Sequence, residues 1–397
     1  YLPLAFSRAG RSASDWRSAL SKGCAGRLSL RHFLGSFTFF IIKDLFSEES
    51  RQRTSSYIII EAVTTVSTPR VIPCWMLKIF KENTMSEPLF LQSVMQEKIW
   101  GGTKLRDVFG YEIPSDHVGE YWAISAHPNG VSTVKNGRFA GQKLDVLYAE
   151  HRELFGNRPE PVFPLLTKIL DANDWLSVQV HPDDAYGLEH EGELGKTECW
   201  YVIAADEGAE IIYGHNAKSK EELRQQIESK DWDHLLTKIP VKAGDFFYVP
   251  SGTMHAIGSG ILILETQQSS DTTYRVYDFD RKDDAGNLRE LHLEQSIDVL
   301  TIGEPANSRP VTIQADSLTS TLLVANDFFA VYKWDIAGSV NFKKTADYSL
   351  VSVLEGVGEL EVDGTVYPLG KGEHFILPSD VTEWTLSGDL QLIVSHP

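Results

Sequence analysis

Four side chains in the middle of the chain have the types and the spacing that bind a divalent metal. Gln179 and His181 are separated by one residue in Gln-Val-His, so on a strand both point to the same face. Glu198 begins the run Glu-Cys-Trp-Tyr-Val-Ile, and His255 follows the corner Pro-Ser-Gly-Thr-Met. Two imidazoles and a carboxylate from three strands, with Gln179 as a weak oxygen ligand, suit a catalytic metal with positions open for water or substrate.

Each of these residues also has an ordinary explanation. A His–Pro pair such as His181–Pro182 is common in loops, and a glutamate that begins a strand is usually solvated. A half-buried strand that turns Gln179 and His181 inward needs partners for both, because unpaired buried polar groups are costly. On spacing alone, a metal site and unrelated roles for the single residues stand equally open.

The elements that would position these residues are short strands. From Phe90 onward, runs of β-branched and aromatic residues are separated by Gly, Pro, Asn and Asp. Strands this short and frequent indicate antiparallel sandwiches or barrels, so we expect a mainly β fold. Helical patterns occur at Leu144–Leu154 and at Ser219–Leu236, and the second opens with a capping box from Ser219 to Glu222. Examples of predicted strands are Trp175–Val180, Trp200–Ala204, Glu210–Tyr213, Asp245–Val249 and Ile261–Glu265.

An internal repeat favours two small barrels. Residues 242–255 can be laid over residues 370–383, and each copy reads as a Gly-acid turn, an apolar strand, a Pro corner and a second strand. This is the hairpin of a small jelly roll, so we expect two cupin-like jelly-roll barrels with a few helices. His255 in the first copy becomes Glu383 in the second, so the metal is expected in the first barrel only. The other matched residues are Gly244 with Gly372, Asp245 with Glu373, and Pro250 with Pro378.

The composition also suggests where the chain divides. We expect a catalytic cupin domain over residues 85–300 and a smaller C-terminal barrel without metal over 301–397, linked near Glu304–Pro310. Residues 1–84 are rich in Ser and Arg, and their apolar runs are too short to span a bilayer. We interpret them as upstream or non-native sequence outside the fold, with Met85 as the natural start, in preference to a transit peptide.

The charge of the chain argues against polyanionic partners. The formal net charge is −18, and from Met85 onward 25 Lys and Arg face 49 Asp and Glu, a net charge of −24. Nucleic acids and anionic membranes are therefore unsuitable partners, because like charges repel. From Met85 onward Cys199 is the one cysteine, which fits a reducing cytoplasm. The sequence has no Walker-type loop and no Cys-x-x-Cys pair, so nothing in it indicates a nucleotide or redox cofactor.

Four motifs resemble, in their order, those of type I mannose-6-phosphate isomerases. They are Gln179-Val-His-Pro182, Gly195-Lys-Thr-Glu198, Pro250-Ser-Gly-Thr-Met-His255 and the run from Glu265 to Asp278. The resemblance extends from about Leu89 to the C-terminus and is strongest to the short bacterial branch, which pairs a catalytic cupin domain with a smaller second barrel. It implies one zinc ion per chain, and the implied ligands are His181, Glu198 and His255, with Gln179 at the fourth position.

The resemblance also implies the reaction, the interconversion of mannose 6-phosphate and fructose 6-phosphate. Moving a proton between C1 and C2 through an enediol(ate) needs a base near both carbons and an electrophile at the carbonyl oxygen. Glu265 is the first candidate for the base and Lys196 the second, and both match motif positions in the same pocket. Arg275 matches the active-site arginine and would stabilise anionic oxygens.

Ordinary roles for two of these residues are the alternatives. Arg275 could pair with Asp271 or Asp278, and Glu265 could be a surface residue at the end of a strand. At the level of function, the alternatives are an Fe(II) cupin dioxygenase, whose site is usually richer in histidine, and a non-catalytic sugar-phosphate-binding cupin. The sequence leaves open the metal bound in the cell, the oligomeric state and the purpose of the second barrel.

Overall fold

The computed structural model describes residues 86–282 and 285–397, together with three short strands of the segment before them. The chain divides into two units, Tyr1–Thr84 and Met85–Pro397. In the first unit the described strands form an antiparallel sheet of their own. The interpretation of residues 1–84 falls mostly outside the described residues, so it stays a prediction. The three strands are β1 (Phe40–Lys43), β2 (Ile59–Ala62) and β3 (Arg70–Val71).

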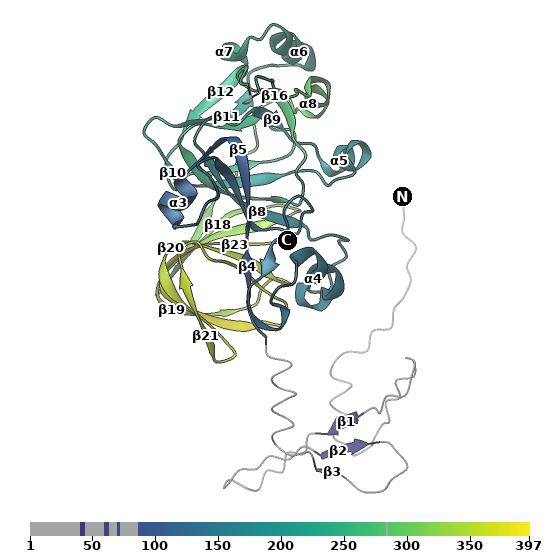
Figure 1. Ribbon diagram of the computed structural model, residues 1–397, viewed down its shortest axis with the longest axis vertical. Coiled ribbons are helices and arrows are strands. Elements are labelled where there is room, and N and C mark those ends of the chain that lie inside the picture. The colour runs from purple at the N-terminus through teal and green to yellow at the C-terminus, as the bar shows by residue number, and fades with distance from the viewer. Residues whose placement is uncertain (1–39, 44–58, 63–69, 72–85, 283–284) are drawn as a thin grey trace, which may run out of the picture. The chain divides into compact units, whose positions relative to one another are not determined.

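Two antiparallel sheets form the first part of the second unit, whose strands run from dark blue to green in Figure 1. Their facing sides share a core of buried side chains such as Trp200, Ile211 and Ile263. The six-stranded sheet has the order β13 (Phe246–Val249), β10 (Glu198–Ala205), β15 (Ile261–Gln268), β8 (Leu165–Ala172), β6 (Val118–Ile124) and β5 (Val94–Gly102). The five-stranded sheet has the order β12 (Leu236–Pro240), β11 (Glu210–His215), β14 (His255–Ile257), β9 (Val178–Val180) and β16 (Tyr274–Tyr277).

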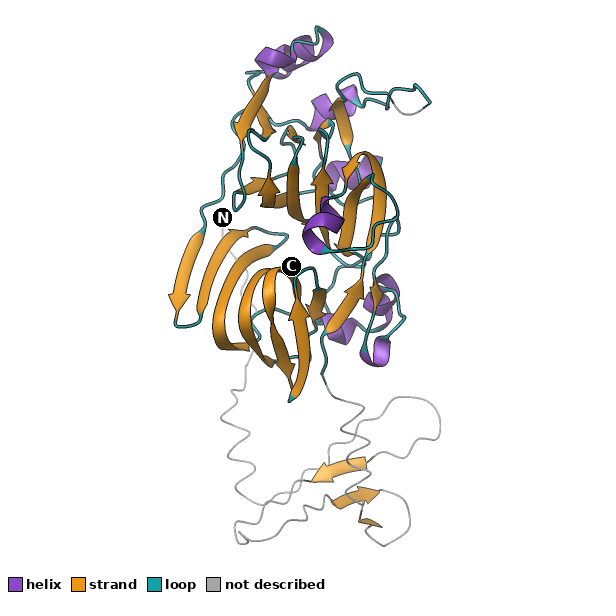
Figure 2. Ribbon diagram, turned by 60° about the vertical axis from the view of Figure 1, so that its left-hand side comes forward, coloured by secondary structure: helices purple, strands orange, loops and turns teal. Residues whose placement is uncertain are grey.

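A third, nine-stranded sheet is built mostly from residues 311–397 and curves strongly (Figure 2). Its strands run in the order β17 (Val311–Ala315), β18 (Leu318–Ala325), β19 (Ala330–Lys343), β23 (Glu383–His396), β20 (Ser349–Val362), β22 (His374–Leu377), β4 (Leu89–Gln92) and β7 (Thr133–Val134), and β21 (Thr365–Gly370) pairs with β20. Two of these strands, β4 and β7, come from the N-terminal part of the unit. A division at residue 300 therefore remains a prediction, and the pairing of β4 with β22 crosses it.

The six-stranded sheet lies between the other two sheets and is buried on both faces. In β15, Ile261 and Ile263 pack toward the five-stranded sheet, whereas Leu262 and Leu264 belong to the core shared with the nine-stranded sheet. Successive side chains of a strand point to opposite faces, so the apolar run at 261–264 supplies both cores at once. Glu265 continues this alternation and faces the five-stranded sheet, since it follows Ile263 by two residues.

The helices are short and lie at the periphery of the second unit, with α6, α7 and α8 at the top of Figure 1. Ser219 caps α6 by accepting a hydrogen bond from the backbone N–H of Glu222, as the capping box predicts. Both predicted helices are shorter than expected, because each breaks into two pieces. The helices are α3 (Lys104–Phe109), η1 (Gly137–Phe139), α4 (Leu144–Glu150), η2 (Arg152–Phe155), α5 (Asp184–His190), α6 (Lys220–Glu228), α7 (Trp232–Leu235) and α8 (Leu293–Val299).

The internal repeat of the sequence is also a repeat of the backbone. Gly244 and Gly372 both have φ near +88° in the turn that opens each copy. The following acid accepts a hydrogen bond from the backbone N–H three residues earlier in both copies, over 2.9 Å for Asp245 and 3.1 Å for Glu373. Strands β13 and β22 follow these turns, and β14 and β23 begin at His255 and Glu383.

These sheets confirm the expectation of a mainly β fold with a few helices. Each of the described sheets is open at both ends in its hydrogen bonding, so the jelly rolls are formed by facing and curved sheets without a closed ladder. The gap between the six-stranded and five-stranded sheets holds the residues that the sequence predicts for the site.

Candidate metal centre

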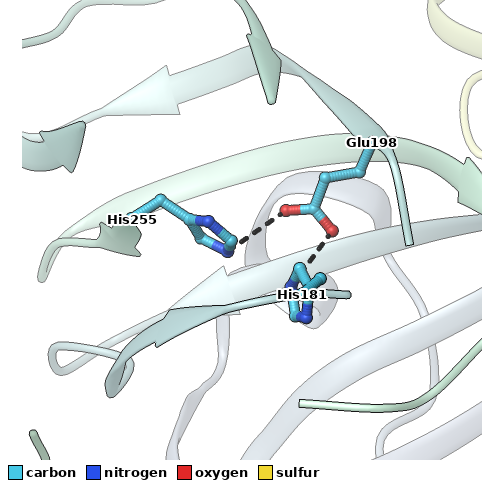
Figure 3. Close-up of side chains that lie close together, drawn as sticks. All are labelled: His181, Glu198 and His255. Atoms are coloured by element: carbon cyan, nitrogen blue, oxygen red, sulfur yellow. Dashed lines mark ion pairs between the residues drawn. The ribbon is translucent and has the colours of Figure 1, made fainter. Parts of the chain in front are cut away.

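Three predicted metal ligands come together between the two facing sheets (Figure 3). His181 directly follows β9, Glu198 is the first residue of β10, and His255 is the first residue of β14. One ligand atom from each lies within 4.8 Å of the others, and all three side chains are buried. Among the described residues, this is the group of three or more His, Cys, Asp and Glu side chains that could hold a metal ion.

The backbone fixes the tautomer of both histidines. His181 Nδ1 lies 2.9 Å from the carbonyl oxygen of Thr272, and His255 Nδ1 lies 2.9 Å from that of Thr253. A carbonyl oxygen can only accept, so each Nδ1 carries the proton and each Nε2 keeps a free electron pair. This is the arrangement in which a histidine binds a metal through Nε2.

The free pairs face the carboxylate of Glu198. Its Oε1 lies 3.4 Å from His255 Nε2, and its Oε2 lies 3.6 Å from His181 Nε2. Burial lowers the pKa of His255 to about 4 and that of His181 well below its ordinary value, so both imidazoles are neutral at pH 7. The two imidazole nitrogens and the two carboxylate oxygens all present electron pairs, so a divalent cation placed among them would be attracted by each of them. The donor set therefore fits a divalent metal.

Gln179 lies beside the same atoms. It is the register partner of His255, and its amide nitrogen is 3.4 Å from His255 Nε2. A half-turn of the terminal amide would exchange this nitrogen for the oxygen, which could then bind the same cation.

Lys196 contacts two of the ligand atoms. Its ammonium lies 3.0 Å from Glu198 Oε2 and 3.2 Å from His181 Nε2. Burial by itself would lower the pKa of Lys196, but the charges of Glu198 and Glu265 outweigh it and raise the pKa above the ordinary value. Lys196 is therefore an ammonium at neutral pH and cannot serve as a base in that state.

Glu265 is buried at 2% exposure, so a surface role at a strand end is wrong. Its Oε2 accepts a hydrogen bond of 3.2 Å from the indole N–H of Trp200, its register partner on β10. Burial and the nearby charge of Glu198 raise the pKa of Glu265 to about 7. A carboxyl group with this pKa can both accept and return a proton at neutral pH.

Arg275 lies on β16 beside Gln179, its register partner. Its Nε donates to Ser177 Oγ over 3.2 Å, and one terminal nitrogen donates to the carbonyl oxygen of Glu290 over 2.8 Å. Neither acid proposed as its partner pairs with it. Asp271 lies 3.6 Å from Lys168, and Asp278 is bonded to Arg281 and Arg289. The guanidinium of Arg275 is thus half-buried with no carboxylate ion pair among the described residues.

The sequence did not indicate that Glu193 supports the site. Its Oε2 accepts hydrogen bonds from Ser270 Oγ, the backbone N–H of Asp271 and Thr272 Oγ1, over 3.2, 3.1 and 3.1 Å. These bonds hold the loop whose Thr272 carbonyl orients His181. Glu193 lies in a polar loop and no local pattern marks it. The sequence could have indicated Trp200, because its spacing of two residues from Glu198 places both side chains on the same face of a strand.

Comparison with known proteins agrees with this geometry. Residues 89–203 match the family model of the phosphomannose isomerase type I catalytic domain, and residues 319–397 match that of the mannose-6-phosphate isomerase cupin domain. A mannose-6-phosphate isomerase of Streptococcus mutans is 72% identical over 312 residues, which cover 79% of this chain and 99% of the relative. The chain belongs to the type I mannose-6-phosphate isomerase family.

A relative and a crystal structure from Bacillus subtilis support the same family assignment. The mannose-6-phosphate isomerase ManA is 54% identical over 315 residues, covering 78% of this chain and 99% of ManA. A crystal structure of the mannose 6-phosphate isomerase from that organism superposes with a TM-score of 0.77 at 52% identity, over 78% of this chain and 99% of that one. The family expected from the motifs is therefore confirmed. Within the described part of the chain, no helix has the length and apolar character needed to cross a membrane.

Proposed function

We propose that this chain interconverts mannose 6-phosphate and fructose 6-phosphate. The proposal is carried by the buried group of His181, Glu198 and His255 in a chain 72% identical to a mannose-6-phosphate isomerase. The substrates are small sugar phosphates, and nothing in the acidic body suits nucleic acid. Phosphorylated sugars are charged and do not cross membranes freely, so the proposal also places the protein in the cytoplasm.

The metal that we propose is zinc, one ion per chain. Two neutral imidazoles, a carboxylate and an amide oxygen are a ligand set that zinc accepts with a position left for substrate. When bound, zinc would act as a Lewis acid toward the oxygens of the sugar. We propose that residues 301–397 form the smaller barrel without metal, because Glu383 stands where His255 stands in the first copy.

Glu265 is the proposed base, in preference to Lys196. Its pKa of about 7 supports this role, since the same carboxylate must take a proton from one carbon and return it to the next. Lys196 is proposed to place a positive charge beside the enediolate oxygens, because its raised pKa keeps it protonated. Arg275, which has no ion-pair partner within the described part of the chain, is proposed to bind an anionic oxygen of the sugar phosphate.

The test uses the full chain mixed with fructose 6-phosphate, before and after chelation. We expect mannose 6-phosphate to form, chelation to abolish its formation, and added zinc to restore it. A folded, zinc-loaded chain that binds the sugar phosphate without turnover would contradict the proposal and favour a sugar-phosphate-binding cupin. Oxygen consumption by an iron-loaded chain would favour a dioxygenase instead.

A further inference from the structure

One indole N–H lies between the two carboxylates of the site. Trp200 Nε1 lies 3.0 Å from Glu198 Oε1 and 3.2 Å from Glu265 Oε2. An indole nitrogen has a single proton and no acceptor, so the two carboxylates share one donor in a three-centre hydrogen bond. Trp200 is 1% exposed, and water has no direct access to this position.

Two different constraints place the indole here. Trp200 follows Glu198 by two residues on β10, so the two side chains share a face. Trp200 is also the register partner of Glu265 on β15, and directly opposed residues of an antiparallel pair share a face. Its ring in addition lies edge-on to the imidazole of His255, with centroids 5.3 Å apart. One side chain thus touches two proposed metal ligands and the proposed base.

The two oxygens of Glu198 have separate partners. Oε1 accepts from Trp200, whereas Oε2 forms its ion pair with Lys196 over 3.0 Å. Each oxygen keeps a further electron pair directed toward the histidines, 3.4 and 3.6 Å away. The N–H at Oε1 restricts the rotation of this carboxylate, so its metal-binding orientation is set before any metal arrives.

A second Glu-x-Trp in the same sheet shows which part of this arrangement is local. On β6, Trp122 Nε1 donates to Glu120 Oε2 over 2.6 Å, so the contact to the preceding glutamate follows from the strand spacing. Glu120 is paired with Lys98 and Lys168. The bond across to a second carboxylate is present at Trp200 and comes from the pairing of β10 with β15.

We propose that Trp200 is a positioning residue for the isomerase reaction, which holds the metal ligand Glu198 and the base Glu265 in fixed relation through one shared N–H. The inference rests on the proposed function, because only a reaction that uses metal and base on the same substrate requires that relation. Two carboxylates this close repel each other, and a shared donor offsets the repulsion at a defined geometry. Without the N–H, both the ligand and the base lose a fixed position.

The test removes the N–H and keeps an aromatic ring at position 200. Full-length chains with Trp200→Phe, and with benzothienylalanine at position 200, in which sulfur replaces the N–H, are compared with wild type. We expect the zinc dissociation constant, measured by competition with a chelator, to rise about 10- to 100-fold. At saturating zinc we expect kcat to fall about tenfold or more with KM within about twofold, because the substrate contacts remain.

A matched control is Trp384→Phe on β23, whose indole is also buried but finds no hydrogen-bond partner among the residues that the structure describes. This variant should keep the zinc affinity and kcat of wild type. An active wild type whose two position-200 variants keep its zinc affinity or its kcat at saturating zinc would overturn the inference. If wild type itself has no turnover, the proposed function fails, and the zinc dissociation constants still decide whether Trp200 positions Glu198. If Trp200→Phe does not fold, the same two measurements are made on the benzothienylalanine chain, which preserves the shape of the ring, and they decide the inference.

Discussion

At the scale of single residues, neighbouring groups hold the two imidazoles and the carboxylate of the centre in place. The protonated nitrogens of His181 and His255 are committed to backbone carbonyls, and their other nitrogens face Glu198. Desolvation keeps both imidazoles neutral, so the ligand set has a net charge of one carboxylate. Lys196 is a cation beside these ligands. Its ammonium contacts two of the atoms that would bind the proposed metal, Glu198 Oε2 and His181 Nε2.

Lys196 is therefore expected to oppose metal binding while it assists the reaction. In Lys196→Met the zinc affinity should rise by roughly tenfold, because a like charge close to the ligand atoms is removed, while kcat falls. Chelator competition and steady-state kinetics measure the two effects. The exposed Lys242→Met serves as the control and should change neither. A weaker zinc affinity in Lys196→Met would mean that Lys196 helps to hold the ligands.

Arg275 is expected to need its planar shape. Its side chain donates to Ser177 and to the carbonyl of Glu290 at once, and a lysine cannot reproduce both bonds and still bind an anion. Arg275→Lys should lower kcat/KM for fructose 6-phosphate by roughly 10- to 100-fold. Arg224→Lys, which replaces the exposed two-bond contact of Arg224 with Glu294, is the matched control. Equal kinetics in the two variants would contradict the proposed role.

At the scale of elements, the loop between β15 and β16 joins three parts of the site. It follows the strand of Glu265, precedes the strand of Arg275, and supplies the Thr272 carbonyl that orients His181. Glu193 fixes this loop by accepting three hydrogen bonds.

Glu193→Gln should loosen the loop, since an amide oxygen is a weaker acceptor than a carboxylate. We expect a zinc dissociation constant roughly tenfold higher, as for the loss of an outer-shell partner, with a small change in Tm. Glu189→Gln, on α5 of the same region, is the control. Unchanged zinc binding in Glu193→Gln would show that the loop keeps its place without the carboxylate.

The two copies of the repeat offer a comparison at the same scale. Gly244 and Gly372 share a φ of +88°, but a Cβ at Gly372 would lie 2.8 Å from Tyr111 Oη, whereas one at Gly244 has nothing within 4 Å. Gly244→Ala should cost about 1–2 kcal/mol of unfolding free energy from the left-handed backbone alone. Gly372→Ala should cost about 1–3 kcal/mol more from the clash. Denaturant unfolding measures both, and equal losses would contradict the prediction.

At the scale of the whole second unit, the nine-stranded sheet is joined to the rest by a buried polar contact as well as by apolar packing. His374 on β22 lies 2.9 Å from Ser352 Oγ and 3.1 Å from the hydroxyl of Tyr111, which follows α3. Burial lowers the pKa of His374 to about 3 from an ordinary value of 6.5.

This lowered pKa predicts that acid reduces the stability of the folded chain. Between pH 6.5 and about 3 the unfolded chain binds a proton at this residue that the folded chain does not, so the stability falls as the pH falls. One such group contributes a slope of at most about 1.4 kcal/mol per pH unit. His374→Gln should show a shallower fall of the unfolding free energy over this range, and the exposed His234→Gln should change the slope little. An unaltered slope in His374→Gln would contradict the assignment.

The sequence by itself determined the features that depend on short spacing. A strand places residues i and i+2 on one face, so the shared face of Gln179 and His181 could be predicted from the chain, and so could the strand at 261–265. The repeat at 242–255 and 370–383 was visible for the same reason, since each hairpin is a local unit. The family motifs added the expected ligands and the reaction, and the family itself was confirmed.

Only the tertiary structure decided which distant segments pair. Trp200 and Glu265 meet because β10 and β15 pair in one register, and a shift by one residue would turn Glu265 to the opposite face. The same holds for β4, which joins the nine-stranded sheet although it begins the unit, and for Arg275, whose proposed acidic partners bind other residues. Register between strands is set by the packing of whole faces, and that information is spread over the chain and is absent from any local pattern.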